Sequence, residues 1–113
     1  MRYTLAMVLA LAALGCTKPP PAPTTADVSR VEARFPGLTL AELQSGRDLY
    51  RARCGSCHVL YHPATHGATD WPRLLGEMAE RAKLSGPERG RVERYLVAMA
   101  SRSAPPTTTA SAR

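Results

Sequence analysis

The segment that decides the fold is YRARCGSCHVLYHPATH, residues 50–66. It holds two of the three cysteines and all three histidines of a chain of 113 residues. Two residues separate Cys54 from Cys57, and His58 follows the second cysteine directly. Three kinds of site use such residues: a tetrahedral zinc site, a thiol redox pair and a covalent attachment point for haem. The sequence on either side of this segment has to distinguish among them.

The CGSCH motif, from Cys54 to His58, has the spacing of c-type haem attachment. Two thiols at this spacing reach the two vinyl groups of one porphyrin, and His58 is then held under the iron as the proximal ligand. The other ring nitrogen of His58 would be oriented by a backbone carbonyl near Pro63. The motif therefore predicts one covalently bound haem c, held by Cys54 and Cys57.

Two other sites compete with haem in this segment. A zinc site would take four ligands: Cys54, Cys57, His62 and His66. A redox dithiol would require a strand–helix–strand context, and the pattern shows no convincing strand. Haem is favoured because so small a domain needs a cofactor or a staple at its centre.

Helical periodicity predicts three helices in the part of the chain around the motif. The first covers residues 40–53 and contains Gly46, whose missing side chain predicts close contact with another helix. Each helix has a capping residue before it: Thr39, Asp70 and Ser85. Glu42 and Glu88 stand three residues after Thr39 and Ser85, so these two starts are predicted to be capping boxes. The third helix carries apolar side chains at i, i+3, i+4 and i+7, the pattern of one buried stripe: Val92, Tyr95, Leu96 and Met99.

The composition divides the chain into four parts. Residues 1–15 read as a signal peptide, residues 16–38 as a Pro-rich tether, and residues 103–113 as a disordered tail. Residues 39–102 remain as one domain. The predicted fold class is all-α, a small domain of about three helices wrapped around one covalent haem.

This domain resembles a class I cytochrome c across residues 39–102. The residues that carry the resemblance are a helix leading into CGSCH, then Trp71, Met78, the sequence LSGPE and the sequence YL. The resemblance implies that Gly46 and Tyr50 pack across the last helix at Tyr95 and Leu96. It also implies a monohaem electron carrier rather than an enzyme, with no small-molecule substrate.

The resemblance further implies a methionine as the sixth iron ligand, downstream of the motif. Met78 is the leading candidate because a loop separates it from His58, and Met99 is explained by the buried stripe of the last helix. His62, His66, Met99 and an open position remain alternatives. An open position would favour a haem-based sensor of small ligands, and a zinc site would favour an interaction domain without a redox role.

The N-terminus resembles the signal of a bacterial lipoprotein. A single Arg2 precedes an apolar run from Tyr3 to Leu14, and the small residue Gly15 follows it. Cleavage before Cys16 would free that cysteine to carry lipid. The resemblance implies a periplasmic domain, and Thr17 after the lipidated residue implies the outer membrane. Lipid on Cys16 and haem on the other two cysteines would use every sulfur.

The chain has a net charge of +6, with fifteen Lys and Arg against nine Asp and Glu. Such an excess of cations favours an acidic redox partner or an anionic lipid surface. Nucleic acid is not expected as a partner, because the N-terminus predicts export and the chain has no stripe of aromatic and basic residues. The predicted function is single-electron transfer between redox partners by a lipid-anchored periplasmic cytochrome.

Overall fold

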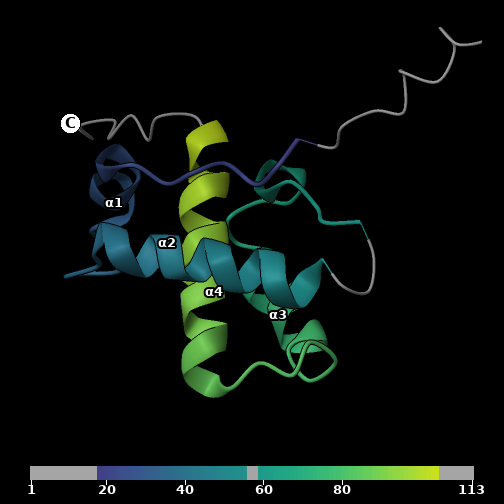
Figure 1. The fold of residues 1–113 in the computed structure, drawn as a ribbon. Helices are drawn as coiled ribbons and strands as arrows, with labels where there is room; N and C mark the ends of the chain where they lie inside the picture. The colour runs from purple at the N-terminus through teal and green to yellow at the C-terminus, as the bar shows by residue number, and fades with distance from the viewer. Residues whose placement is uncertain (1–17, 56–58, 105–113) are drawn as a thin grey trace, which may run out of the picture.

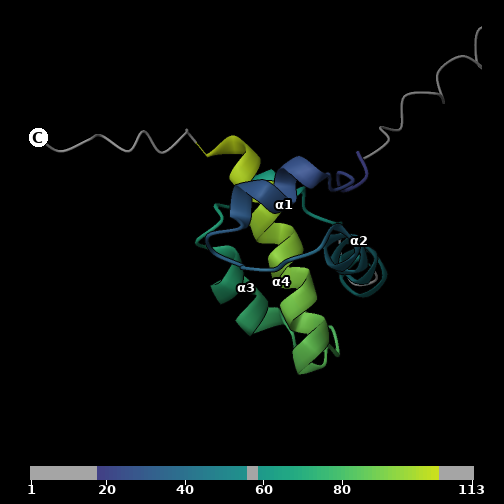
Figure 2. The same ribbon diagram turned by 90° about the vertical axis from the view of Figure 1, so that its left-hand side faces the viewer.

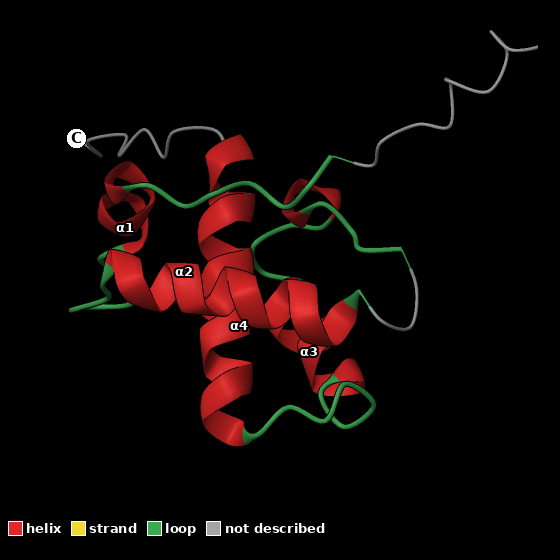
Figure 3. Ribbon diagram, viewed as in Figure 1, coloured by secondary structure: helices red, strands yellow, loops and turns green. Residues whose placement is uncertain are grey.

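The structure, a computed structural model, describes residues 18–55 and 59–104, and these residues form helices and loops without any strand (Figures 1 and 3). The helical elements in chain order are α1 (Thr25–Val31), α2 (Leu40–Leu49), the π-helix η1 (Tyr50–Cys54), the 3-10 helix η2 (Pro63–Thr65), α3 (Trp71–Met78), α4 (Gly86–Ala100) and the 3-10 helix η3 (Ser101–Ser103). The predicted all-α class is confirmed. The predicted first helix divides into α2 and η1, so its last turn is wider than an α-helix.

Helix α2 crosses the middle of α4, and Gly46 lies at the crossing (Figure 1). A Cβ atom added at Gly46 would lie 2.9 Å from the Cβ of Tyr95 and closer still to the Arg91 carbonyl oxygen. One turn further on, the Tyr50 ring packs on Tyr95 with 6.2 Å between ring centroids. The predicted contact of Gly46 and Tyr50 with the last helix is therefore confirmed.

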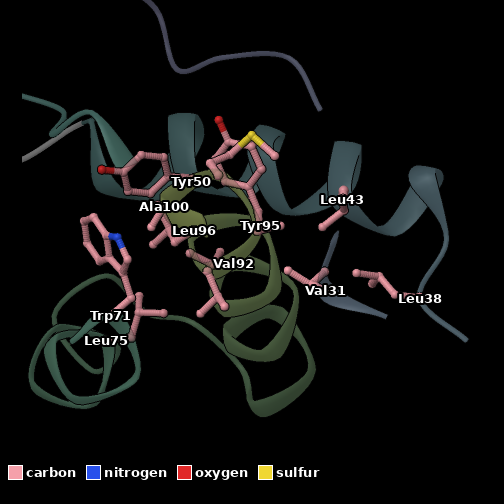
Figure 4. Packing of buried hydrophobic residues seen from close by; sticks show 13 residues of the cluster. Val31, Leu38, Leu43, Tyr50, Trp71, Leu75, Val92, Tyr95, Leu96 and Ala100 are labelled. Carbon is pink, nitrogen blue, oxygen red and sulfur yellow. The ribbon is translucent and has the colours of Figure 1, made fainter. Parts of the chain in front are cut away.

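Helix α4 is the centre of the hydrophobic core, and α1, α2, α3 and η2 all contact it (Figures 1 and 4). Every residue from Tyr95 to Ala100 is buried. Val97 and Ala98 lie outside the stripe predicted from the sequence, so the end of α4 is covered on more sides than one amphipathic face requires. Met99 is 2% exposed, which confirms its prediction as a core residue.

Two of the predicted helix starts have the expected capping boxes. The Thr39 hydroxyl accepts a hydrogen bond from the Glu42 amide (3.2 Å), and the Glu42 carboxylate accepts one from the Thr39 amide (2.9 Å). Ser85 and Glu88 repeat this arrangement at α4, with distances of 3.3 and 2.9 Å. Asp70 makes no side-chain cap bond because its own backbone is already helical, with φ −84° and ψ −31°.

The N-terminal segment differs from the predicted tether. Residues 20–38, which we call the strap, contain helix α1 and pass over the end of α4 (Figure 2). Val31 and Leu38 belong to the core cluster, and Val28 and Phe35 pack against it. These four residues recur at intervals of three and four, an apolar pattern that the high proline content of the preceding residues obscured, and α1 contains Val28 and Val31. The packed domain thus begins near residue 20 rather than at residue 39.

Candidate functional site

An apolar cleft lies between η1, the loop after the haem motif and α3. Its walls are Tyr50, Cys54, Tyr61, His66, Trp71, Leu74, Leu75, Met78, Ala82 and Leu84. The cleft encloses about 30 Å³. Two of its walls, Tyr61 and Met78, are 48% and 38% exposed, although both are large hydrophobic residues. The cleft therefore has a fixed floor on the core side and an outer wall that faces solvent.

Cys54 reaches this cleft from the last position of η1 and is partly buried there. Gly55 follows it, and a Cβ atom on Gly55 would lie 2.9 Å from the Arg51 carbonyl oxygen, so the tight turn after η1 excludes a side chain. Cys57 and His58, the other two predicted haem-binding residues, lie outside the described residues. Their predicted roles, and that of Cys54, stay predictions.

Met78 is the last residue of α3 and lines the same cleft as Cys54. The structure therefore places the first predicted haem-attachment residue, Cys54, and the predicted sixth ligand, Met78, in one cleft. Met99, the other downstream methionine, lies in the core away from the cleft walls. Between the two methionines, the geometry favours Met78 as the sixth ligand, and this assignment too stays a prediction.

The two histidines of the loop have different surroundings. The His62 Nδ1 accepts a hydrogen bond from the Ala64 amide at 3.1 Å and caps η2 on the surface. His66 lines the cleft, with its ring edge-on to Trp71 at 5.0 Å and to Tyr61 at 5.8 Å between centroids. Within residues 18–55 and 59–104, no three His, Cys, Asp or Glu side chains gather as a metal site. The zinc alternative therefore gains no support from the part of the chain that is described.

Trp71 fixes the loop to α3. Its indole Nε1 donates a buried hydrogen bond of 2.9 Å to the Pro63 carbonyl, the carbonyl region predicted to orient His58. Trp71 is the first residue of α3, so this bond joins the loop to the start of the helix. The indole N–H is consequently used inside the protein, and Trp71 acts as an anchor.

Tyr50 forms the floor of the cleft. Its ring is edge-on to Trp71 at 6.4 Å between centroids (Figure 4), and its hydroxyl donates to the Tyr61 carbonyl at 2.5 Å. Burial, reinforced by nearby Cys54 and Tyr95, raises the pKa of Tyr50 above its usual value. Tyr50 thus remains a neutral donor that ties η1 to the loop.

The sequence did not predict one wall of the cleft. Ala82 and Leu84 line it, and Lys83 between them has a φ of 54°, a left-handed conformation that turns the chain. The Arg53 guanidinium donates to the Lys83 carbonyl at 3.1 Å and contacts Glu88 at 3.4 Å. Arg53, one residue before the first cysteine of the motif, therefore binds η1 to the turn before α4. No sequence pattern marked this contact, because Lys83 contributes only its backbone.

The remaining predicted site residue, Cys16, lies outside the described residues, as does the predicted signal peptide. Among the residues that the structure describes, none of the helices has both the length and the apolar character required to span a membrane. The lipid anchor and the location of the protein stay predictions.

The residues of the cleft fit a haem in their chemistry. Apart from Cys54 and His66, the walls are aliphatic, aromatic or thioether side chains, which suit a porphyrin face. Cys54 offers a thiol at one wall, and Met78 offers a thioether. The exposed outer wall at Tyr61 and Met78 is the side that a porphyrin would cover.

Comparison with known proteins supports the prediction of a c-type cytochrome and corrects the predicted family. A family model described as dihaem cytochrome c matches residues 50–113. No curated protein and no solved structure matches the chain. The match supports a c-type cytochrome with haem-based electron transfer, and it replaces the class I monohaem family that the sequence resembled. The chain belongs to the dihaem cytochrome c family.

Proposed function

We propose that this chain binds a single haem c and carries single electrons between redox partners in the periplasm, where lipid on Cys16 anchors it to the outer membrane. The observation that carries the proposal is the cleft in which Cys54 and Met78 share apolar walls, placed directly at the only C-x-x-C-H motif of the 113 residues. The family match supports the haem and the electron transfer.

The number of haems is where this chain departs from its family name. A second haem attached in the same way would need two more cysteines and a following histidine. The chain has one further cysteine, Cys16, and Thr17 and Lys18 follow it. One haem for each chain is therefore the stoichiometry that the cysteine count supports.

In the proposed site Cys54 and Cys57 hold the porphyrin, His58 is the proximal ligand and Met78 is the distal ligand. Bound haem iron supplies one-electron chemistry. A thioether from Met78 favours the ferrous state and raises the potential, and the apolar walls act in the same direction because they disfavour the more charged ferric state. Two protein ligands leave no position for a substrate, which supports a carrier rather than an enzyme.

The first experiment tests covalency and stoichiometry. The chain is produced in a host with haem attachment machinery, and intact mass and acid-acetone extraction are measured. We expect a mass increase of one haem that survives extraction. An increase of two haems would restore the dihaem arrangement, and loss of all haem would leave the zinc-stapled interaction domain as the better explanation.

The second experiment tests the distal ligand. Met78→Ala should retain the haem, lose the long-wavelength absorption of methionine ligation and lower the potential by roughly 0.1 V or more, within the range that axial ligands control. Met99→Leu is the matched control and should leave both unchanged because Met99 lies in the core. An unaltered spectrum in Met78→Ala would transfer the role to His66, and CO binding by the unmodified protein would favour the sensor alternative.

A further inference from the structure

The strap is fixed to the domain by its backbone carbonyls. Side chains from three places bind three successive carbonyls: Arg47 Nε to Pro20 at 2.9 Å, the Tyr95 hydroxyl to Pro21 at 2.8 Å, and Arg102 Nη2 to Ala22 at 3.1 Å. Proline has no amide hydrogen, so its carbonyl is the one backbone group by which it can be held. Pro20 and Pro23 are themselves buried. A segment rich in proline is here a docked element.

An ion pair with a buried carboxylate fastens the strap a second time, and its arginine partners lie at the surface. Asp27 is 1% exposed, and its carboxylate accepts hydrogen bonds of 2.8 and 2.6 Å from Arg102. Arg30, one turn further along α1, donates to the same carboxylate at 2.5 Å. Burial alone would raise the pKa of Asp27, but the hydrogen bonds from Arg102, Thr24 and Arg30 outweigh it and lower the pKa below its usual value. The carboxylate is therefore charged and held whenever the protein is folded at neutral pH.

The docked strap shortens the connection between the domain and the lipid. If residues 16–38 were a free tether, the domain could lie as far as about 80 Å from the lipidated residue, at the extended rise of a chain. Because the chain is held from Pro20 onward, only residues 17–19 remain to span this distance, which limits it to about 14 Å.

We propose that the strap holds the cytochrome directly against the lipid surface, with the face around Pro20 turned toward the headgroups. The proposal rests on the lipidation of Cys16 in the proposed function. The cations on that face support it: Lys18 is exposed beside Pro20, and Arg47 binds the Pro20 carbonyl. Positive charge at this place complements anionic headgroups. Electron partners would then be proteins within or close to the same membrane.

The test measures the distance between protein and membrane. Lipidated holoprotein is placed on a supported bilayer of zwitterionic phospholipid with a minority of anionic phosphatidylglycerol, and neutron reflectometry gives the protein profile. We expect a sharp protein layer whose water gap is below about 14 Å. A variant with a flexible Gly-Ser segment, as long as the strap, inserted between Thr17 and Lys18 should widen the gap several-fold. A broad, distant layer for the unmodified protein, equal to that of the insertion variant, would overturn the proposal.

A second measurement separates the strap from the anchor. Hydrogen exchange of the holoprotein in solution should show protected amides in α1, and Arg102→Gln should reduce that protection by about tenfold, as expected for losing charged hydrogen bonds. Arg73→Gln is the control because its partner Glu77 is exposed and lies on α3. Protection in α1 without retention on the bilayer would overturn the anchor and with it the membrane contact. Retention without protection in α1 would overturn the strap alone.

Discussion

The two sides of α4 differ in how they are closed. On one side, α2 and the strap cover the helix with a close backbone crossing at Gly46, buried prolines and the buried carboxylate of Asp27. On the other side, η1, the loop and α3 surround a cleft whose outer wall leaves Tyr61 and Met78 exposed. The first side is closed by the polypeptide itself. The second side has apolar walls that would suit the proposed haem, so the closed side and the proposed site lie on different sides of α4.

Substitution at the crossing of α2 and α4 should cause the largest loss of stability on the side of α4 that the polypeptide covers. Gly46→Ala would place a Cβ atom against the backbone of Arg91, which no side-chain rotation relieves. We expect the free energy of unfolding of the holoprotein to fall by about 3 kcal/mol, at the upper end of overpacking costs, as measured by denaturant titration.

Gly90→Ala is the matched control for this crossing. Gly90 lies in α4, and a Cβ atom there would meet no atom within 4 Å beyond the backbone of its own helix and its two chain neighbours. Alanine should stabilise the helix by up to about 1 kcal/mol because of its higher helix propensity. Equal responses of the two variants would show that α2 and α4 do not cross as closely as the structure has them.

Loss of the ion pair of the strap should cause the second-largest decrease in the free energy of unfolding. Asp27→Asn leaves Arg102 without its charged partner and should lower the free energy of unfolding by about 2 kcal/mol. Glu77→Gln removes an exposed ion pair on α3 and should change it by less than about 0.5 kcal/mol. Thermal or denaturant unfolding of both variants measures the difference between a pair with a buried carboxylate and a pair in which both side chains are exposed.

The same carboxylate sets an acid dependence. The pKa of Asp27 is lowered in the folded protein, so the unfolded state binds protons first as pH falls. The stability from this group is full above the unfolded pKa near 3.8 and is lost progressively below it, as pH falls through the folded pKa. Unfolding between pH 6 and pH 2 should therefore show a shallower loss of stability for Asp27→Asn than for the unmodified protein. Parallel profiles would mean that Asp27 is not paired in solution.

On the side of α4 that α2 and the strap cover, local sequence patterns predicted some contacts and missed others. The capping boxes at Thr39 and Ser85 and the role of Gly46 followed from the sequence, since each depends on residues a few positions apart or on one missing side chain. The docking of the strap did not follow, because it depends on contacts such as Arg102 with Asp27 between residues 75 positions apart. The proline-rich composition that suggested a tether indicates an extended backbone. It does not indicate which side chains bind the backbone carbonyls of that segment.

The cleft was predicted through its motif and less well through its walls. Cys54 followed from the spacing of the motif, and Trp71 and Met78 followed from the resemblance to a cytochrome; all three line the cleft. Arg53 and the turn at Lys83 were missed because their contact uses a backbone carbonyl, which every residue has. A site assembled by side chains leaves a sequence signal, and a site closed by backbone atoms leaves none.

Removing one hydrogen-bond donor on each side of α4 should lower the free energy of unfolding by similar amounts. Only the donor that lines the cleft should also affect the haem spectrum. Trp71→Phe deprives the buried Pro63 carbonyl of its donor, and Tyr95→Phe deprives Pro21 of its donor. Each should cost about 1 to 2 kcal/mol of unfolding free energy. The haem absorption spectrum should shift in Trp71→Phe, which lines the cleft, and stay unchanged in Tyr95→Phe. A spectral shift in both would mean that the two sides are not independent.

The smallest contrast concerns the two capping boxes. Thr39→Ala and Ser85→Ala each remove one cap acceptor and should each lower the free energy of unfolding by about 1 kcal/mol. They should differ in where the loss appears, because the partner of Ser85 is Glu88, which also contacts Arg53 beside Cys54. Ser85→Ala should therefore increase hydrogen exchange in η1 next to the cleft, whereas Thr39→Ala should increase it only at the start of α2. Identical exchange patterns would show that Arg53 does not couple the start of α4 to the cysteine, and the cleft would then depend on Tyr50 and Trp71 alone for its position on the core.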